Sequence, residues 1–331
     1  MRILIIGGTT FVGRHLVAEA IARGHTVTVL HRGIACAGAP GAEHLHADRN
    51  DDLGVLADRQ WDATVDVCAY WPKQVGRLAD ALGDRGGRHL LVSTVSVYAD
   101  PPEPGLDEDA ALQAPLGLDG DTPPIDGTSY GALKVGCEHV AQQRYAGELL
   151  VVRPTYIIGP HDPTARFPYW VDRLARGGTV LCPGSPEVPF QSIDARDLAT
   201  FMVGLLEAGE EGTFHAMNPA PPYSFAEMLA EVRAAVAPPG TALEWIPSGW
   251  LTERGVTPAM LPMWGGSDDP EFGLAMDPAR AEAAGLRSRP LGETAADTLR
   301  WSADPSSGWA GRGGHLDPTR EQELLSEWSG R

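Results

Sequence analysis

The amino-terminal part of the chain joins a short apolar run to an amphipathic stretch. RILII, at 2–6, is an unbroken apolar run of strand length. From Val12 to Arg23, apolar residues recur at intervals of three and four, the spacing of a helix with one buried face. The segment between them reads GGTTFVG, at 7–13. The pattern therefore predicts a strand, a glycine-rich turn and a helix.

The same alternation continues along the first two thirds of the chain. Apolar runs predict further strands at 26–31, 44–48, 63–69, 89–97, 149–154 and 213–218. Helical spacing predicts a helix that buries Val75, Leu78 and Leu82, and further helices at 129–145 and 197–209. Strands that alternate with helices indicate an α/β fold with a doubly wound parallel sheet.

Two regions depart from this alternation. The segment 99–128 is rich in proline, glycine and acidic residues, and loops of this length are usually functional or disordered. The last third carries many tryptophans and prolines and ends in a helix introduced by Asp317 and Pro318. We expect a nucleotide-binding domain at 1–159 and 191–218, and a smaller, irregular substrate-binding lobe at 160–190 and 219–331.

Composition narrows the classes of partner. The formal net charge of -18 opposes binding to nucleic acid and to anionic membranes. No apolar run is long enough to span a bilayer, and the first residues already form a strand, so we expect a cytoplasmic, globular protein. The cysteines lack metal-site spacing, which predicts reduced thiols and no metal. They are Cys36, Cys68, Cys137 and Cys182.

The glycine turn suits a phosphate group. A turn that joins a strand to a helix directs backbone N–H groups and the positive end of the helix dipole at one place, where a pyrophosphate can bind. The spacing is Gly7-x-x-Thr10-x-x-Gly13, with Gly8 in addition. A tight turn without a ligand is the alternative.

Tyr130 and Lys134 are the candidates for proton transfer. They are four residues apart and so share one face of the predicted helix. A phenol with a pKa near 10 needs a shift of about three units, roughly 4 kcal/mol, to exchange protons at neutral pH, and a neighbouring ammonium favours the phenolate. Lys73 and Lys134 are the only lysines. The alternative is an ordinary helix residue beside a surface charge.

The order of these motifs resembles the extended and atypical short-chain dehydrogenase/reductases, in particular the NAD-dependent epimerase/dehydratase family. Further similar segments are STVSVY (93–98), RPTYIIGP (153–160), IDARDLA (193–199) and RPLGETAADTLRW (289–301). The resemblance implies a Rossmann fold and a triad of Thr94, Tyr130 and Lys134, with Ser96 in reserve for Thr94. It implies cofactor contacts from Gly7, Thr9, Thr10, Phe11, Val12, Gly13, His31, Arg32, Asp48 and Lys134.

The end of the second strand bears on the choice of cofactor. NAD-preferring members place an acidic residue there to accept from the ribose 2′-hydroxyl, whereas this chain has His31 and Arg32. A guanidinium can hold a 2′-phosphate, so we expect NADP(H), with NAD(H) possible. The alternative for Arg32 is a solvated surface charge. Asp48 resembles the family's adenine-contacting acid, or it caps a helix.

The substrate positions depart from those of many relatives. Tyr156 stands where nucleotide-sugar enzymes have asparagine, and Phe190 stands where many have arginine, which weakens a diphosphate site. Val95 and Ser96 replace the Asp-Glu pair of dehydratases, so sugar dehydration is disfavoured. The candidate substrate-binding residues are Ser96, Tyr156, His161, Arg166 and Trp170, for each of which a packing role is the alternative.

The sequence thus predicts an NADP(H)-dependent oxidoreductase that moves hydride to or from a carbonyl or carbinol carbon of a small polar metabolite. An epimerase of sugars or nucleotide sugars, using the same triad in a transient oxidation, is the alternative enzyme. A non-catalytic dinucleotide sensor is the alternative of another class. The resemblance also makes a homodimer possible.

Overall fold

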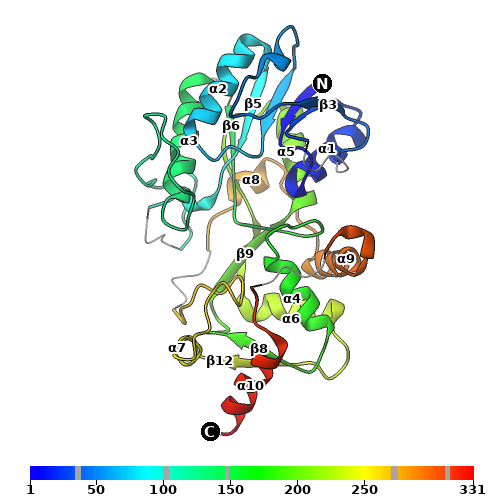
Figure 1. Ribbon diagram of the computed structural model, residues 1–331, viewed down its shortest axis with the longest axis vertical. Helices are drawn as coiled ribbons and strands as arrows, with labels where there is room; N and C mark the ends of the chain where they lie inside the picture. The colour runs from blue at the N-terminus through cyan, green and yellow to red at the C-terminus, as the bar shows by residue number, and fades with distance from the viewer. Residues whose placement is uncertain (34–38, 100–103, 146–148, 270–274, 310–313) are drawn as a thin grey trace. The chain divides into compact units, whose positions relative to one another are not determined.

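The computed structural model describes residues 1–33, 39–99, 104–145, 149–269, 275–309 and 314–331 (Figure 1). The chain divides into two compact units. The first comprises Met1–Tyr156, Ala195–Ala220 and Met276–Arg287, and the second comprises Ile157–Asp194, Pro221–Ala275 and Ser288–Arg331. These limits differ from the expected ones by placing 219–220 and 276–287 with the first unit and 157–159 and 191–194 with the second. The segment 276–287 bridges to the long loop, because Asp277 N donates to Leu106 O at 2.9 Å.

A seven-stranded sheet forms the centre of the first unit, in the order β10-β6-β5-β4-β1-β2-β3. Each neighbouring pair of strands is parallel. The strands are β1 (Arg2–Ile6), β2 (Thr26–His31), β3 (Glu43–His46), β4 (Ala63–Asp66), β5 (Arg88–Val92), β6 (Leu149–Pro154) and β10 (Gly212–Ala216). The predicted doubly wound α/β fold is confirmed, and the predicted strands are present, four of them with shifted ends.

Helices cover both faces of this sheet. α1 packs beside α5 on one face and α2 beside α3 on the other (Figure 1). The helices of this unit are α1 (Phe11–Ala22), α2 (Pro72–Leu82), α3 (Tyr130–Arg144), α5 (Ala195–Ala208) and the short α8 (Ala279–Ala283). Short 3₁₀ turns lie at η2 (Gly54–Leu56), η3 (Gly83–Arg85) and η4 (Val95–Val97).

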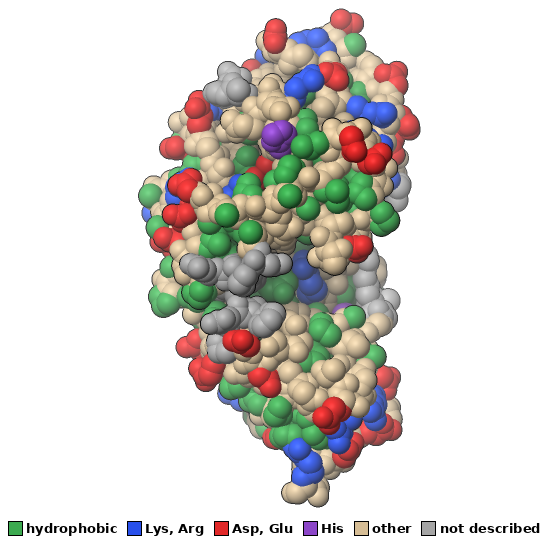
Figure 2. All heavy atoms as spheres, turned by 90° about the vertical axis from the view of Figure 1, so that its left-hand side faces the viewer, with side chains coloured by type: hydrophobic (Ala, Val, Ile, Leu, Met, Phe, Trp, Pro, Cys, Tyr) green, Lys and Arg blue, Asp and Glu red, His purple; other side chains and the backbone are tan. Residues whose placement is uncertain are grey.

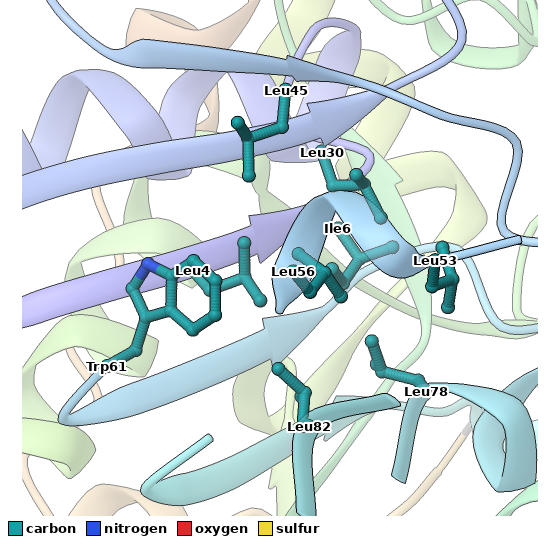
Figure 3. Close-up of a cluster of buried hydrophobic side chains, with 9 residues drawn as sticks. All are labelled: Leu4, Ile6, Leu30, Leu45, Leu53, Leu56, Trp61, Leu78 and Leu82. Carbon is teal, nitrogen blue, oxygen red and sulfur yellow. The ribbon is translucent and has the colours of Figure 1, made fainter. Parts of the chain in front are cut away.

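One apolar cluster fixes α2 and the amino-terminal strands. Figure 3 shows leucines of α2, β1, β2 and β3 directed toward one another together with Trp61. Its members are Leu4, Ile6, Leu30, Leu45, Leu53, Leu56, Trp61, Leu78 and Leu82. All are at least 95% buried, so their removal from water is the main stabilisation of this half of the sheet. The apolar positions expected to face inward at Leu78 and Leu82 do so.

The fifth strand is shorter than the sequence pattern predicts. It ends at Val92, and Val95–Val97 forms the turn η4 instead of continuing the strand. Thr94 Oγ1 accepts from Ser96 N at 3.1 Å and lies 3.2 Å from Ser96 Oγ. These local side-chain bonds compete with a strand ladder, which explains why the apolar pattern extended the strand too far.

Two glycines let α3 approach its neighbours closely. A Cβ at Gly131 would lie 2.1 Å from Ser96 O, and one at Gly136 would lie 2.4 Å from Leu116 O and 2.6 Å from Pro72 Cγ. Only hydrogen at these positions allows the helix to rest on η4 and on the long loop. The glycines therefore set the position of the first turn of α3.

A buried polar network holds the described part of the long loop, from 104 onward, against the sheet. Arg153 of β6 pairs with both carboxylate oxygens of Glu138, at 3.0 and 2.7 Å. Its Nη1 donates to Tyr98 Oη at 2.7 Å and to Glu108 O at 2.9 Å. Glu108 in turn accepts from His215 N at 2.8 Å. Because these groups satisfy one another, the loop is ordered without a large apolar core of its own.

The second unit contains small sheets and five helices within the residues that the structure describes. A three-stranded sheet has the order β11-β9-β7, and β12 pairs with β8 in parallel. The strands are β7 (Tyr156–Ile158, whose first residue belongs to the first unit), β8 (Thr179–Pro183), β9 (Pro189–Asp194), β11 (Asn218–Ser224, whose first three residues belong to the first unit) and β12 (Ala242–Ile246). The helices are α4 (Arg166–Ala175), α6 (Phe225–Val236), α7 (Ser248–Thr252), α9 (Leu291–Ala303) and α10 (Pro318–Ser329), with a 3₁₀ turn η6 (Pro305–Ser307).

The described helices, surface side chains and cysteines bear on the classes of partner that the sequence analysis excluded. Within the described ranges, no helix is both long and apolar enough to cross a membrane. On the face drawn in Figure 2, the described Asp, Glu, Lys and Arg side chains are scattered, and the basic ones form no continuous surface there. Cys68, Cys137 and Cys182 are free thiols, as expected, and Cys36 lies outside the described residues.

His89 predicts a loss of stability in acid. Its ring is fully buried, stacks on Tyr145 with centroids 3.8 Å apart, and neither ring nitrogen has a partner among the described residues. Burial lowers the pKa of His89 from 6.5 to about 4. The folded state therefore resists protonation, and stability present above pH 6.5 is lost as the pH falls toward 4. We expect this group to cost about 2 kcal/mol between pH 7 and pH 5.

Urea unfolding of wild type and His89→Phe at both pH values checks this prediction. The phenyl ring keeps the stacking without a titratable group, so the variant should lose less stability on acidification. Equal losses in the two proteins would show that His89 does not contribute.

Gly131→Ala tests the contact between α3 and η4. The added methyl group would have to displace backbone, so we expect a stability loss of roughly 1–3 kcal/mol. Gly127→Ala is the matched control, because a Cβ there meets nothing within 4 Å. Thermal unfolding of both variants measures the difference, and an unchanged midpoint for Gly131→Ala would contradict the packing described here.

Candidate active site

The glycine turn is built for close approach of backbone to a ligand. Gly7 has φ +89°, a conformation that side chains rarely adopt, and a Cβ there would lie 2.8 Å from Cys68 Sγ. A Cβ at Gly13 would lie 2.2 Å from Gly7 O, so this glycine lets α1 begin directly against the turn. Thr10 is the N-cap residue of α1, but its hydroxyl does not cap the helix. The turn thus leaves amide groups at a helix amino terminus.

A cavity of about 460 Å³ lies beside this turn in the first unit. Among the predicted cofactor-binding residues, six are on its wall: Gly7, Thr9, Thr10, His31, Arg32 and Asp48. Phe11, Val12 and Gly13 instead begin α1 and are not among the lining residues. A cavity next to a glycine turn, with donors at its wall, fits a dinucleotide.

The far end of the cavity carries opposite charges. Arg32 follows β2, its side chain is 62% exposed, and its Nη1 lies 3.8 Å from Asp48 Oδ2. Asp48 Oδ1 accepts from Asn50 N and Asn50 Nδ2, both at 2.8 Å. The next helical turn begins at Gly54 with Leu53 as its N-cap, so Asp48 shapes a turn and does not cap a helix. The guanidinium and the carboxylate are both at the position where a ribose would be recognised.

An ion pair that the sequence analysis missed underlies the cavity. Arg49 Nη1 and Nη2 donate to the two oxygens of Asp66 at 2.6 Å each, and both residues are buried. Burial alone would raise the pKa of Asp66, but the Arg49 guanidinium outweighs it and the pKa is lowered. Arg49 Nη1 also lies 3.4 Å from Cys68 Sγ. The sequence signal that could have indicated this ion pair was the aspartate inside the apolar run ATVDV.

This pair leaves one donor unused at the cavity wall. Arg49 Nε is buried and has no partner among the described residues, although Arg49 lines the cavity. A buried, unsatisfied donor is costly unless a ligand or water accepts from it. Arg49 Nε is itself closed to solvent, so the fit of a nucleotide to this wall rests on the glycine turn.

Lys134 is the best-defined member of the predicted triad. It is 3% exposed, and its Nζ donates to Ala69 O at 2.7 Å and to Val92 O at 2.8 Å. These carbonyls follow β4 and end β5, so the ammonium lies at the carboxyl edge of the sheet, where open α/β folds bind ligands. The predicted ribose contact of Lys134 stays a prediction.

Tyr130 and Thr94 lie near this ammonium. Tyr130 is the first residue of α3, one turn before Lys134, and the adjacent Gly131 rests on Ser96 O. Tyr70 is 42% exposed; its partial burial and then the Tyr130 phenol raise its pKa, and the Lys134 ammonium opposes both effects. Tyr70, which also lines the cavity, was not predicted.

The predicted substrate residues other than Ser96 and Tyr156 belong to the second unit. The His161 ring lies 5.4 Å from that of Trp301, and Arg166 Nε donates to Thr164 Oγ1 at 3.0 Å. Trp170 is completely buried and donates to Pro262 O at 2.7 Å, the contacts of a core residue. Ser96 is exposed beside Thr94, and Tyr156 begins β7. Their substrate contacts stay predictions.

Within the described ranges, no group of His, Cys, Asp or Glu residues is arranged to hold a metal ion. Besides the Arg49–Asp66 pair, the predicted triad supplies a phenol, an ammonium and a hydroxyl on the elements at the carboxyl edge of the sheet. Such a set can exchange one proton with a bound carbonyl or carbinol oxygen and can hydrogen-bond a ribose.

Solved structures with the same fold are numerous. UDP-glucuronic acid 4-epimerase from Bacillus cereus, in complex with NAD, has a TM-score of 0.65 at 15% identity, covering 91% of this chain and 98% of its own. Human epimerase family protein SDR39U1, with NADPH, has a TM-score of 0.64 at 23% identity, covering 91% and 99%. UDP-glucose 4-epimerase from Thermotoga maritima, with UDP-glucose, has a TM-score of 0.67 at 16% identity, covering 91% and 98%.

These similarities establish the fold, and the family follows from the sequence itself. No curated protein matches the sequence. A model of the NAD dependent epimerase/dehydratase family, however, matches residues 46–218, just over half of the chain. That match includes the Thr94 turn, Tyr130 and Lys134. The chain therefore belongs to the NAD dependent epimerase/dehydratase family.

Proposed function

We propose that the protein is an NADP(H)-dependent oxidoreductase that reduces a carbonyl group, or oxidises a carbinol, of a small polar metabolite. The observation that carries this proposal is the burial of Lys134 one turn after Tyr130, at the carboxyl edge of the sheet. In the proposed assignment, Tyr130 exchanges the proton, Lys134 favours its phenolate and Thr94 hydrogen-bonds the substrate oxygen.

The proposed proton chemistry follows from the electrostatic effect of the Lys134 ammonium on the Tyr130 phenol. The bound nicotinamide supplies or accepts the hydride at its C4 atom. In the reducing direction, Tyr130 Oη donates a proton to the oxygen that becomes the hydroxyl, and the reverse reaction returns that proton. Lys134 stabilises the phenolate left by donation, because a nearby ammonium favours the charged form. The two carbonyls that bind its Nζ keep the ammonium in place.

The preference for NADP(H) is proposed from Arg32. Its exposed guanidinium, at the end of β2 and on the cavity wall, can pair with a 2′-phosphate. Asp48 is the competing feature, because a carboxylate favours the free 2′-hydroxyl of NAD(H). The human relative of this fold was solved with NADPH and the Bacillus cereus relative with NAD, so both cofactors occur on this scaffold.

The substrate class is proposed from one residue of the second unit, Phe190. Phe190, at the position aligned to the arginine of nucleotide-sugar enzymes, is 3% exposed and packs 6.3 Å from the Phe225 ring. A buried phenyl group cannot supply the charge that a diphosphate requires. We therefore favour a metabolite without a nucleotide diphosphate.

An epimerase is the second candidate. Several solved proteins with this fold are 4-epimerases of UDP-sugars, and the same triad would serve a transient oxidation. An epimerase regenerates its cofactor on the enzyme and retains it tightly, whereas an oxidoreductase must exchange it in every turnover.

The nucleotide content of purified protein separates these candidates. We expect the protein to emerge from gel filtration largely free of nucleotide and to bind added NADPH reversibly. Absorbance and chromatography of the supernatant after acid denaturation measure retained nucleotide. Near-stoichiometric retained NAD(H) or NADP(H) would overturn the oxidoreductase and favour the epimerase.

Tyr130→Phe tests the acid–base assignment. We expect kcat to fall by roughly 10²–10⁴-fold, while NADPH affinity changes by less than about twofold, since the phenol exchanges the substrate proton and is not a major contact for the adenosine half. Steady-state turnover, on a carbonyl panel, and fluorescence titration with NADPH provide the two measurements.

Tyr145→Phe is the matched control on the same helix region. Tyr145 Oη has no partner among the described residues, so its removal should leave kcat unchanged. If Tyr130→Phe retained full turnover, Tyr130 would be removed from the mechanism.

A further inference from the structure

Three imidazoles meet at the end of the cavity where the family recognises the ribose. His31 ends β2, and His44 and His46 lie on the same face of β3, with His31 and His46 directly paired across the strands. The ring centroid of His31 lies 5.0 Å from that of His44 and 4.4 Å from that of His46. We call these three residues the histidine cluster. His31 itself lines the cavity.

The hydrogen bonds of the cluster define its protonation. Gly33 N donates to His31 Nδ1 at 3.0 Å, so this nitrogen carries no proton and Nε2 does. His31 Nε2 lies 2.9 Å from His44 Nδ1, which must then accept. His44 Nε2 lies 3.1 Å from Ala39 O and donates to it. This chain of bonds is complete only when His31 and His44 are neutral.

The charged side chains around the histidine cluster are mostly paired with one another, so one added proton would change the net charge of this subsite. Arg32 and Asp48, 3.8 Å apart, contribute charges that cancel. On β3, Glu43 is engaged by Arg59 at 2.7 Å and by Thr28 at 3.2 Å. β1 presents the apolar Ile6 beside Leu30, and α1 carries Arg14 and His15 in its first turns. Burial, and then His46 and His44, lower the pKa of His31.

We propose that the histidine cluster links binding of a 2′-phosphorylated dinucleotide to uptake of a proton, so that preference for NADP(H) over NAD(H) increases as the pH falls below neutral. This inference rests on the proposed function, in that the cavity must bind a dinucleotide. Near neutral pH the subsite is close to neutral and discriminates weakly. A phosphate dianion favours the protonated cluster, which takes one proton from solvent, whereas a ribose hydroxyl does not.

The direction of the pH dependence distinguishes proton uptake by the protein from titration of the 2′-phosphate on the ligand. A ribose 2′-phosphate loses charge in acid, with a second pKa near 6, and this alone would weaken NADPH binding as the pH falls. A stronger preference for NADPH over NADH at pH 6 than at pH 8 must therefore come from the protein. The three rings share hydrogen bonds and ring contacts, so we assign the added proton to the cluster and not to one ring.

Fluorescence titrations with NADPH and NADH at pH 8, 7 and 6, at constant ionic strength, test the proposal. We expect the ratio of the two affinities to rise by about tenfold from pH 8 to pH 6 in the wild type. Calorimetry in two buffers of different ionisation enthalpy should count up to one proton taken up per NADPH near pH 6.5 and none per NADH. A ratio that does not change with pH would overturn the inference.

Variants assign the effect to the cluster. His46→Gln removes the solvent-exposed ring, and His31→Asn keeps an acceptor near Gly33 N while removing the titratable group. Both should flatten the pH dependence of the affinity ratio. His139→Gln, on an exposed histidine of α3, is the control and should behave as the wild type. An unchanged pH dependence in both cluster variants would overturn the assignment.

The same titrations distinguish this inference from the proposed function. If NADPH and NADH both bind with a constant affinity ratio, the proposed function stands and the histidine cluster is only structural. If neither nucleotide binds at any pH, the dinucleotide site is refuted, and the inference fails with it.

Discussion

The buried ammonium of Lys134 is the interaction on which the candidate site depends. An ammonium taken out of water must find acceptors, and this one finds the carbonyls of Ala69 and Val92 at the carboxyl ends of two adjacent strands. These bonds fix α3 to the sheet edge. Gly131 then allows the first turn of α3 to rest on the Thr94 turn. One cation therefore determines where a phenol and a hydroxyl can meet a substrate.

The cavity beside this edge is organised by charge as well as by shape. Arg49, held by its buried ion pair with Asp66, lines the cavity, and Arg32 and Asp48 place opposite charges on its wall. A site with balanced charges gains little selectivity from either residue alone. The protonation of neighbouring imidazoles can then change its net charge, which is why the histidine cluster bears on the choice of cofactor.

Much of the first unit could be predicted from local patterns. Apolar runs and helical spacing located the parallel strands, α1, α3 and α5, because each element buries a continuous face that the sequence displays. The predicted fifth strand was too long, because the Thr94 hydroxyl accepts a hydrogen bond from the backbone N–H of Ser96, and a hydropathy pattern does not reveal such a bond. The small sheets of the second unit, such as β8 with β12, join segments far apart in the chain. Arg49 was missed because its partner Asp66 is distant in sequence.

The central claim is that Tyr130, held beside the Lys134 ammonium, faces the reactive end of a dinucleotide seated on the glycine turn. A crystal structure of the complex with NADPH tests it most directly. The account predicts the pyrophosphate at Gly7–Gly13 and the Tyr130 hydroxyl directed at the space beside nicotinamide C4, within hydrogen-bonding distance, about 3 Å, of a substrate oxygen placed there. A nicotinamide bound elsewhere, or a Tyr130 hydroxyl directed away from the ring, would contradict it.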